Sequence, residues 1–557
     1  MNRFNHFTTS FLIVGCVLAT LHVTAFADQV DVVTTFESAG IRVELKGSFK
    51  GQSPPIQFRE RGATAWRDAF PMWYDERDQQ LRGSVVGLQP GTAYEGRIRR
   101  GGRMTMFQFK TWPAKFPVAE TINLPRRSDQ TLWIRRSGTP QGYLRYRPQT
   151  QRGLIDVKGS SKVCVRISAS YVVLQKMDLR KAAVHGILLD DGVHDVVIED
   201  CDISGWGRID ERGWGVNMDS AIFSRGKEVR KIVIQGCRLH HPRSNSNSWM
   251  EVRPVPGKPN NRHPGGPLAI CLAHSRGNHV IRFNSCYSDP QHQFNDVFGG
   301  AENYSRVGFP NRDSDIYGND LRDCVDDAIE AEGGNCNVRI WGNRINESYV
   351  AIATATTSVG PLYVYRNVVG SSRKSPQHPM SKENQGAFLK HSDRMAGGRI
   401  FVLHNTLLQG KALRASGASA SSRGVGTGLG WGGPIVNVVS RNNILDVAGG
   451  AAINDRNRDR RSSYDFDLIN GRTRFGGGNE PNGITGAPVW TESSIRNLRP
   501  GNPDIVPAAQ SPSVDTATKL PNFNDNFEGR GPDIGAQEMH GEVMRYGADA
   551  FRGDLRH

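Results

Sequence analysis

A short motif recurs through the second half of this chain and restricts the folds open to it. Each copy reads aliphatic-x-aliphatic-x-x-(Asn or Cys)-x-aliphatic. One copy supplies only a single short strand, so it cannot bury its own apolar face and successive copies must stack. The repeat therefore predicts a β-solenoid. The clearest copies are VVIEDCDI (196–203), IVIQGCRL (232–239), VRIWGNRI (338–345), YVYRNVV (363–369) and FVLHNTL (401–407).

The shared Asn or Cys position is predicted to run as a ladder along the solenoid. An Asn side chain can satisfy the inward-facing backbone groups of a turn and bond to the Asn of the coils on either side. Cys is small and weakly polar, so it can fill the same place where no such bond is needed. We interpret these residues as structural. They are Cys201, Cys237, Cys286, Asn319, Asn343, Asn367, Asn405 and Asn442.

The amino terminus is typical of a secretory signal peptide, predicted here over residues 1–27. Arg3 provides the positive charge, residues 11–21 form a short apolar core, and Ala25-Phe26-Ala27 makes a cleavage site. No later stretch of about 18 apolar residues follows, so no membrane span is predicted. We expect a secreted or periplasmic protein. Seven of the eight cysteines would remain, and an odd number excludes a complete disulfide framework.

The charge balance indicates an anionic partner. The chain has 70 Lys and Arg against 55 Asp and Glu, a net charge of +15. A basic exported protein is attracted to polyanions. No nucleic-acid-binding motif is present, so nucleic acid is not predicted. An acidic or sulfated polysaccharide suits an exported protein better, and the protein is expected to be a monomer.

Residues 38–113 differ from the repeat that follows. Alternating strands such as IRVELKG (41–47) and MFQFKTW (106–112) flank the segment GLQPGTAYEGRIR (87–99). The apolar residue, Pro-Gly turn and Tyr of that segment resemble the tyrosine corner of a fibronectin type III module. The resemblance implies a small β-sandwich that acts as a spacer or adaptor. Its corner residues would be Leu88, Pro90 and Tyr94.

The remainder of the chain resembles the right-handed parallel β-helix, or pectin-lyase-like, superfamily. The solenoid is predicted over 119–446, and 447–557 is predicted to be a C-terminal extension that packs on or caps it. The segment GPDIGAQE (531–538) resembles a closing motif of bacterial β-helix proteins. The predicted fold is thus all-β, a parallel β-helix preceded by a small sandwich. Enzymes and binding proteins share this fold, so function must be argued from the site.

Two segments are expected to stack as equivalent strands of consecutive coils, HQFNDVFGG (292–300) and VDDAIEAEGG (325–334). Neighbouring carboxylates repel one another unless they share a proton, a cation or a basic group of a substrate. With Ile329 inward, strict alternation places Asp326, Glu330 and Glu332 on the outward face. Asp327 has the opposite parity unless the strand bends there, and Asp296 has the parity of Phe298. The stack would gather Asp296, Asp326, Asp327, Glu330 and Glu332.

The leading hypothesis is glycoside hydrolysis, which uses one carboxyl as acid and another as base. Asn295-Asp296, Asp326-Asp327 and Lys390 resemble the polygalacturonase-type hydrolases. The resemblance implies that Asp327 is the acid and that Asp296 and Asp326 activate water. Lys390 would bind a carboxylate or sulfate of the substrate. The chain departs from that pattern at Lys390-His391, where Arg-x-Lys is expected, and at Tyr349, where a His is expected.

Two alternatives remain open. Glu330-Ala331-Glu332 resembles the Glu-x-Glu that binds Ca²⁺ in chondroitinase-B-type lyases. That resemblance implies β-elimination on a uronate, with Ca²⁺ on Glu330 and Glu332 and with Lys390 or an Arg as base. The other alternative is a non-catalytic protein that binds glycans or the cell surface.

Long loops beside the acidic segments are predicted to shape a substrate groove. The loop 240–266 carries Trp249 and Arg253, and the loop 410–433 carries Trp431. A Trp beside an Arg suits a sugar platform with an acid-binding edge. Trp249, Arg253 and His391 are therefore the predicted substrate-binding residues.

Overall fold

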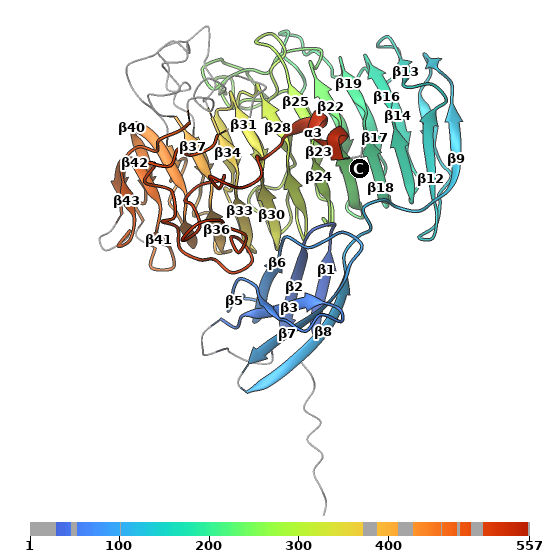
Figure 1. The fold of residues 1–557 in the computed structure, drawn as a ribbon. Coiled ribbons are helices and arrows are strands. Elements are labelled where there is room, and N and C mark those ends of the chain that lie inside the picture. Colours follow the sequence, from blue (N-terminus) through green and yellow to red (C-terminus); the bar gives the residue numbers. More distant parts are fainter. Residues whose placement is uncertain are drawn as a thin grey trace, which may run out of the picture.

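The computed structural model describes residues 29–45, 49, 53–100, 102–370, 387–409, 427–457, 459–475, 480–491 and 505–554. The predicted signal peptide lies outside the described residues. Among the described helices, none is long and apolar enough to cross a membrane. The predicted parallel β-helix is confirmed, because the strands from residue 118 onward pair in parallel into three columns that run the length of the molecule (Figure 1).

The first column is a 12-stranded sheet, and the other two columns together form a 23-stranded sheet. Column A contains β9 (Val118–Leu124), β12 (Tyr143–Pro148), β15 (Val172–Gln175), β18 (His194–Glu199), β21 (Arg230–Gln235), β24 (Val280–Arg282), β27 (Asp315–Tyr317), β30 (Val338–Trp341), β33 (Leu362–Tyr365), β36 (Ile400–Leu403), β39 (Val438–Arg441) and β41 (Ser463–Asp465).

Column B follows column A in each coil. It contains β10 (Arg127–Ser128), β13 (Gly153–Asp156), β16 (Met177–Arg180), β19 (Asp202–Ser204), β22 (Arg238–His240), β25 (Ser285–Tyr287), β28 (Asp320–Arg322), β31 (Arg344–Asn346), β34 (Val368–Val369), β37 (Thr406–Leu408), β40 (Ile444–Asn454), β42 (Leu468–Arg474) and β43 (Ile484–Thr485). The stack therefore continues to residue 485.

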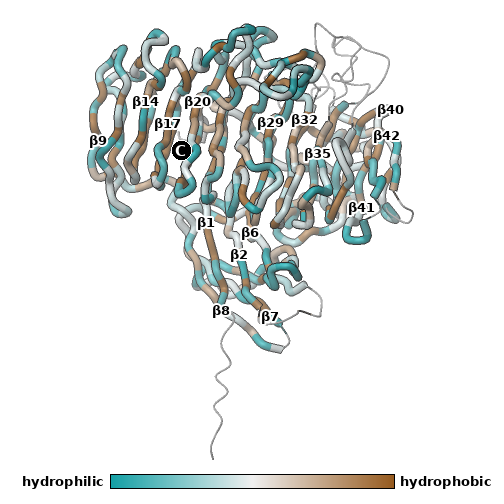
Figure 2. Tube along the Cα trace, turned by 180° about the vertical axis from the view of Figure 1, so that it is seen from behind, coloured by the Kyte–Doolittle hydropathy of each residue, from teal (hydrophilic) through white to brown (hydrophobic). Residues whose placement is uncertain are grey.

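Column C completes the coil and carries the acidic segments. It contains β11 (Leu132–Ile134), β14 (Val163–Ile167), β17 (His185–Leu189), β20 (Ser220–Ser224), β23 (Leu268–Leu272), β26 (Phe298–Gly299), β29 (Asp327–Glu330), β32 (Val350–Ala353), β35 (Ala387–Lys390) and β38 (Thr427–Leu429). Several strands of this column face the viewer in Figure 2, among them β29, β32 and β35. Apolar side chains from all three columns form one continuous core along the axis.

The predicted Asn ladder is present and is held by repeated side-chain bonds. The Nδ2 group of Asn343 donates to the carbonyl of Ile316 at 2.9 Å and to Oδ1 of Asn367 at 2.9 Å. Its Oδ1 accepts from the backbone N–H of Asn319 at 3.1 Å. Each rung therefore ties three coils together. The buried Asn rungs are Asn284, Asn319, Asn343, Asn367, Asn405 and Asn443.

Two predicted rungs are wrong by one or two residues. Asn284, not Cys286, accepts the N–H of Cys237 at 3.0 Å, while Cys286 pairs in register with Leu321 inside the core. Asn443, not Asn442, takes the last Asn rung. Both errors fall where two residues of the right type stand close together. The seven described cysteines are all buried and free, so Cys324 and Cys336 are not bridged.

The N-terminal part folds as two antiparallel four-stranded sheets. One has the order β1 (Val30–Thr34), β2 (Ala39–Glu44), β6 (Gln80–Val85), β5 (Trp73–Asp75), and the other β4 (Arg67–Asp68), β3 (Ile56–Glu60), β7 (Ala93–Arg100), β8 (Arg103–Lys110). The sheets enclose their own apolar core. The Tyr94 hydroxyl accepts the N–H of Gln89 at 2.8 Å, as a tyrosine corner requires. The fibronectin type III assignment stays a prediction.

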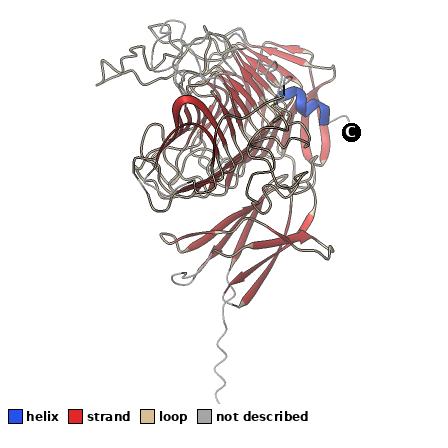
Figure 3. Cartoon of the chain, turned by 60° about the vertical axis from the view of Figure 1, so that its left-hand side comes forward, coloured by secondary structure: helices blue, strands red, loops and turns tan. Residues whose placement is uncertain are grey.

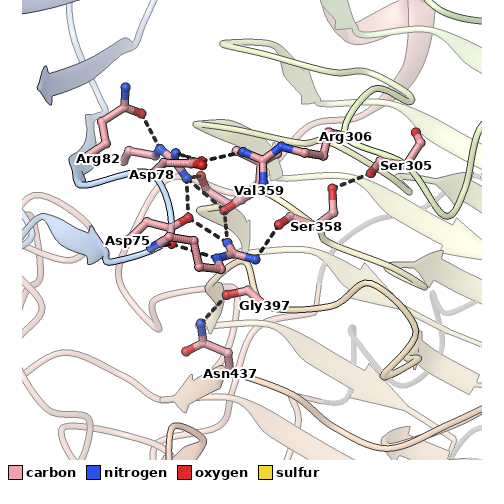
Figure 4. A network of polar contacts seen from close by, with 12 residues as sticks. Asp75, Asp78, Arg82, Ser305, Arg306, Ser358, Val359, Gly397 and Asn437 are labelled. Carbon is pink, nitrogen blue, oxygen red and sulfur yellow. Dashed lines mark hydrogen bonds and ion pairs between the residues drawn. The ribbon is translucent and has the colours of Figure 1, made fainter.

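The sandwich is attached to the middle coils through a polar network, seen from close by in Figure 4. Nη1 of Arg82 bonds to Asp75 at 2.8 Å and to the carbonyl of Val359 at 3.0 Å. Arg82 also bonds to Asp78, which in turn meets Arg306 of the β-helix at 2.5 Å. Arg82 is buried, and each charged group that it contacts carries the opposite charge. The interface therefore holds the sandwich against the middle coils.

The chain after the last coil returns along the outside of the β-helix, and the only helix among the described residues, α3 (Gly547–Asp554), packs near its middle (Figures 1 and 3). Asn442 pins this return by accepting the N–H of Thr518 at 3.0 Å. Asn522 bonds to both backbone groups of Val86 in the sandwich, at 2.8 and 2.7 Å. The extension therefore ties the two parts of the chain together.

Candidate functional site

The two acidic segments stack as the sequence predicts. Phe298 pairs with Ile329, and the N–H of Asp326 bonds to the carbonyl of Asn295 at 3.0 Å. The N–H of Asp327 bonds to Oδ1 of Asp296 at 3.0 Å. These bonds place Asp296 directly beside the Asp326-Asp327 pair of the next coil.

Asp327 points out of the core although its parity matches that of Ile329. The reason is that two consecutive residues, Ala328 and Ile329, both pack into the core, so the strand does not alternate there. The later coils repeat this departure: Val350 and Ala387, in register with Asp327, belong to a separate outer cluster. The bend resolves the parity conflict and joins Asp327 to the other acids.

Three aspartates form the centre of the cluster. Asp296, Asp326 and Asp327 each offer a carboxylate oxygen, and the three oxygens lie within 4.8 Å of one another. Their exposed fractions are only 5%, 4% and 1%. Three buried carboxyls at this separation can all be charged only if a cation lies among them. Without a cation they must share a proton. The oxygen-only donor set is also one that Ca²⁺ accepts.

Lys390 reaches into this cluster from two coils away. Its backbone is in register with Ala353, which is in register with Glu330. The small side chain of Ala353 leaves room for the lysine to extend back across it. Its Nζ lies 2.7 Å from Oδ2 of Asp327 and 3.1 Å from Oε1 of Glu332. Burial acts to lower the pKa of Lys390, but Asp327 and Glu332 outweigh it and raise the pKa well above its usual range.

The remaining carboxyls hold protons more tightly than usual. Burial, followed by repulsion from neighbouring acids, raises the pKa of Asp296 and Asp326 well above the usual range. Burial likewise raises the pKa of Glu332, although Lys390 opposes it. Burial and the charge of Asp327 raise the pKa of Glu330 to about 7. Glu330 accepts from Nδ2 of Asn303 at 2.9 Å and from the N–H of Gly300 at 3.3 Å.

These shifts predict a pH-dependent stability. A carboxyl whose pKa is raised on folding binds its proton more tightly in the folded state than in the unfolded state. Its contribution to the stability of the fold is therefore lost as the pH rises, and for Glu330 the loss occurs between pH 4.5 and about pH 7. We expect Asp326→Asn, which removes another such carboxyl, to raise the melting temperature relative to wild type by an amount that grows as the pH rises above the usual pKa of an aspartate. Glu211→Gln, at an exposed carboxylate, should show no such trend. A constant difference between Asp326→Asn and wild type would contradict the buried-acid interpretation.

Three aromatic side chains lie along one edge of the carboxylates. The Nε1 group of Trp249 donates to Oδ1 of Asp326 at 3.1 Å. The ring of Tyr349 lies 6.4 Å from that of Trp249 and 5.8 Å from that of Trp431. Trp431 bridges in parallel to Lys390. The predicted platform residue Trp249 therefore does adjoin the acids, and Tyr349 and Trp431 extend the same apolar surface.

The side chains of two predicted substrate-binding residues are turned into the protein. His391 is buried; its Nδ1 lies 3.4 Å from Oγ1 of Thr354, and burial lowers its pKa to about 4. The guanidinium of Arg253 binds the carbonyls of Gly215, at 2.7 Å, and Gly265. It thereby holds the loop that carries Trp249. We place both residues as supports of the site.

Glu330 and Glu332 differ in their surroundings, although the sequence pairs them as a Ca²⁺ site. Glu332 faces the Lys390 ammonium, whereas Glu330 faces Asn303 and a backbone N–H. The three aspartates form a cluster of oxygens suited to a cation, and the Ca²⁺ assignment of Glu330 and Glu332 stays a prediction. Asn303 and Ala353 were missed at the sequence level, because neither stands in a motif.

Neither a protein-family model nor a curated protein matches the sequence. Two solved structures are similar. An alginate lyase from a Paenibacillus species is 11% identical, with 66% of this chain and 93% of that one covered and a TM-score of 0.27. The major cedar-pollen allergen Jun a 1 is 10% identical, with 68% and 83% covered and a TM-score of 0.25. The likeness concerns the fold alone. The assignment of the right-handed parallel β-helix rests on the sheet topology, and the site must be interpreted from its own geometry.

Proposed function

We propose that the protein is an exported enzyme that hydrolyses glycosidic bonds of an acidic or sulfated polysaccharide at the column C cluster. The observation that carries the proposal is a pair of acids in opposite environments. Asp327 faces the Lys390 ammonium, whereas Glu330 has a pKa near 7. Neighbouring carboxyls whose environments separate their protonation states are what acid and base catalysis requires.

In the proposed reaction, protonated Glu330 donates its proton to the glycosidic oxygen as the bond to the anomeric carbon breaks. The Asp327 carboxylate accepts a proton from a water molecule whose oxygen bonds to that carbon. This assignment exchanges the acid role that the resemblance implies for Asp327, because the Lys390 ammonium lies 2.7 Å from that carboxylate. The Lys390 side chain is 22% exposed, so it can also meet a carboxylate or sulfate of the substrate.

A second candidate function is Ca²⁺-assisted β-elimination on a uronate. The observation that favours it is the triangle of oxygens from Asp296, Asp326 and Asp327. A cation held there would neutralise the uronate carboxylate. Lys390, which the lyase resemblance offers as the base together with an Arg, is bound to two carboxylates and has a raised pKa. A protonated lysine cannot remove a proton, which makes hydrolysis the stronger proposal.

The test is a screen of the purified protein on polygalacturonate, alginate and a sulfated glycan, with dextran as the neutral control. Reducing ends and the ultraviolet absorbance of an unsaturated sugar are recorded together, with and without EDTA. We expect reducing ends without absorbance and no effect of EDTA. Absorbance that disappears with EDTA would favour elimination. Salt-sensitive retention on the glycan without either signal would indicate the non-catalytic alternative.

A further inference from the structure

A second groove lies on column A, away from the carboxylate cluster. It has a volume of about 310 Å³ and crosses the outward faces of β12, β15, β18 and β21. The segment 114–118 forms one wall and Phe551 of α3 the other. Column A is seen with α3 in Figure 1, whereas β29, β32 and β35 of column C are seen from behind in Figure 2. No residue of the described column C strands lines the groove, which is therefore a separate site.

The floor of the groove combines an apolar row with a polar one. Val173 and Val197 are in register on successive coils, and Gln175 and Glu199 are in register beside them. Both oxygens of Glu199 are occupied, since Gln175 and Gln235 each donate an amide N–H to it at 2.5 Å. An apolar strip beside fixed amide groups suits the two kinds of surface on a sugar ring, its C–H face and its hydroxyls.

One wall of the groove is built by a close approach that requires glycine. Gly236 has a φ of +62°, and a Cβ there would collide with the ring of Phe551. The ring of Phe551 also lies 5.8 Å from the guanidinium carbon of Arg282, which lines the groove. Arg282 is fixed in turn by Oε1 of Gln235 at 2.8 Å. The wall is therefore held in place by side chains of the floor.

The rim of the groove carries basic side chains that have no ion-pair partner among the described residues. Lys115, Arg145, Arg147 and Lys176 line it, and within the described part of the chain none of the four makes an ion pair. By contrast, Arg152 on the adjoining coil face is matched by Asp178 and Asp200, both at 2.8 Å. Four cations around a groove whose single lining acid is already bonded leave a positive field open to an anionic ligand.

We propose that this groove binds a chain of an acidic polysaccharide as a non-catalytic anchoring site. The carboxylates of uronate residues would meet Lys115, Arg145, Arg147 and Lys176, and the sugar rings would lie on the valine row between Phe116 and Phe551. The chemistry is that of an anionic sugar chain rather than of a bare phosphate, because the floor offers apolar strips and amides as well as charge. The site does not depend on the column C cluster being catalytic.

The test compares two triple variants with equal loss of charge. Arg145→Ser, Arg147→Ser and Lys176→Asn remove the rim, and the Asn suits the φ of +59° at position 176. Lys110→Ser, Lys227→Ser and Arg472→Ser remove three exposed cations elsewhere. Retention on immobilised polygalacturonate is measured against salt, with immobilised dextran as the blank. Loss of three weak ion pairs should weaken binding by about tenfold, and the control triple should not.

Equal retention of the two triple variants would overturn the proposal, as would competition by duplex DNA that is as effective as competition by polygalacturonate. If the rim triple does not fold, as judged by its melting temperature, the single Lys176→Asn variant and the salt dependence of the wild type decide. Binding is measured without turnover. A catalytically silent protein that still loses retention in the rim triple would support the groove while failing the proposed function.

Discussion

Replacing Glu330 with Gln is expected to lower kcat on the best polysaccharide by about 10²–10⁴-fold, the contribution of a positioned general acid. Gln has nearly the same shape but cannot protonate a leaving oxygen. The side chain can still bond to Asn303, so the fold should be retained. The comparison requires kcat and KM for both proteins, with the melting temperature recorded beside them. A small change in KM with a large fall in kcat would fit an acid that acts in the transition state.

The pH profile gives this prediction a second readout. Because the pKa of Glu330 is raised to about 7, wild-type activity should fall as the pH rises above that value and the acid loses its proton. In Glu330→Gln the residual activity should no longer show that limb. Glu302→Gln is the matched control, since Glu302 follows β26 on the neighbouring coil but is 47% exposed. Full activity of Glu330→Gln would remove this residue from the mechanism and return the acid role to Asp327.

The sequence was sufficient for the fold because the repeat imposes the same physical demand on every coil. Each coil has a strand that buries alternate residues and a turn that needs an internal amide. The resulting periodic pattern in the sequence remains visible even where loops are inserted. The pattern is least exact where two suitable residues are adjacent, as at Asn442 and Asn443. There, only the bonds to Asn405 and Asp467 decide which residue forms the rung.

The sequence predicted which acidic residues make up the site, but it did not predict how they are arranged. Stacking of the two acidic segments was enough to bring Asp296 beside Asp327. The alternation rule, however, placed Asp327 on the wrong face, because it cannot foresee that Ala328 and Ile329 would both turn inward. Nor does sequence spacing show that Lys390, two coils away, pairs with Asp327 and Glu332 across Ala353. Both features depend on contacts between coils.

Replacing Asn343 with Ala is expected to lower the free energy of unfolding by about 3–5 kcal/mol. The change leaves the carbonyl of Ile316 and the N–H of Asn319 without their side-chain partners in a buried turn. Each orphaned buried group costs roughly 1–3 kcal/mol. Oδ1 of Asn367 loses the Nδ2 donor of Asn343 but keeps the backbone N–H of residue 343, so the damage should be concentrated on the side of Asn319. Hydrogen exchange at the Asn319 amide reports this directly, and it should accelerate more than exchange at amides of the N-terminal sandwich.

The matched control for that variant is Cys237→Ala, because Cys237 occupies the same rung in an earlier coil. Its thiol makes only long contacts, 3.4 Å to the carbonyl of Gln235 and 3.7 Å to that of Ile198. Removing it should cost about 1 kcal/mol, the value of a small buried apolar group. Stacked repeats can unfold in parts, so transition midpoints should be compared together with exchange rates. Equal losses from the two variants would mean that the ladder stabilises the coils by filling space. A much larger loss at Asn343 would mean that its bonds are what each coil depends on, and that Cys is tolerated only where a neighbouring Asn such as Asn284 supplies the acceptor.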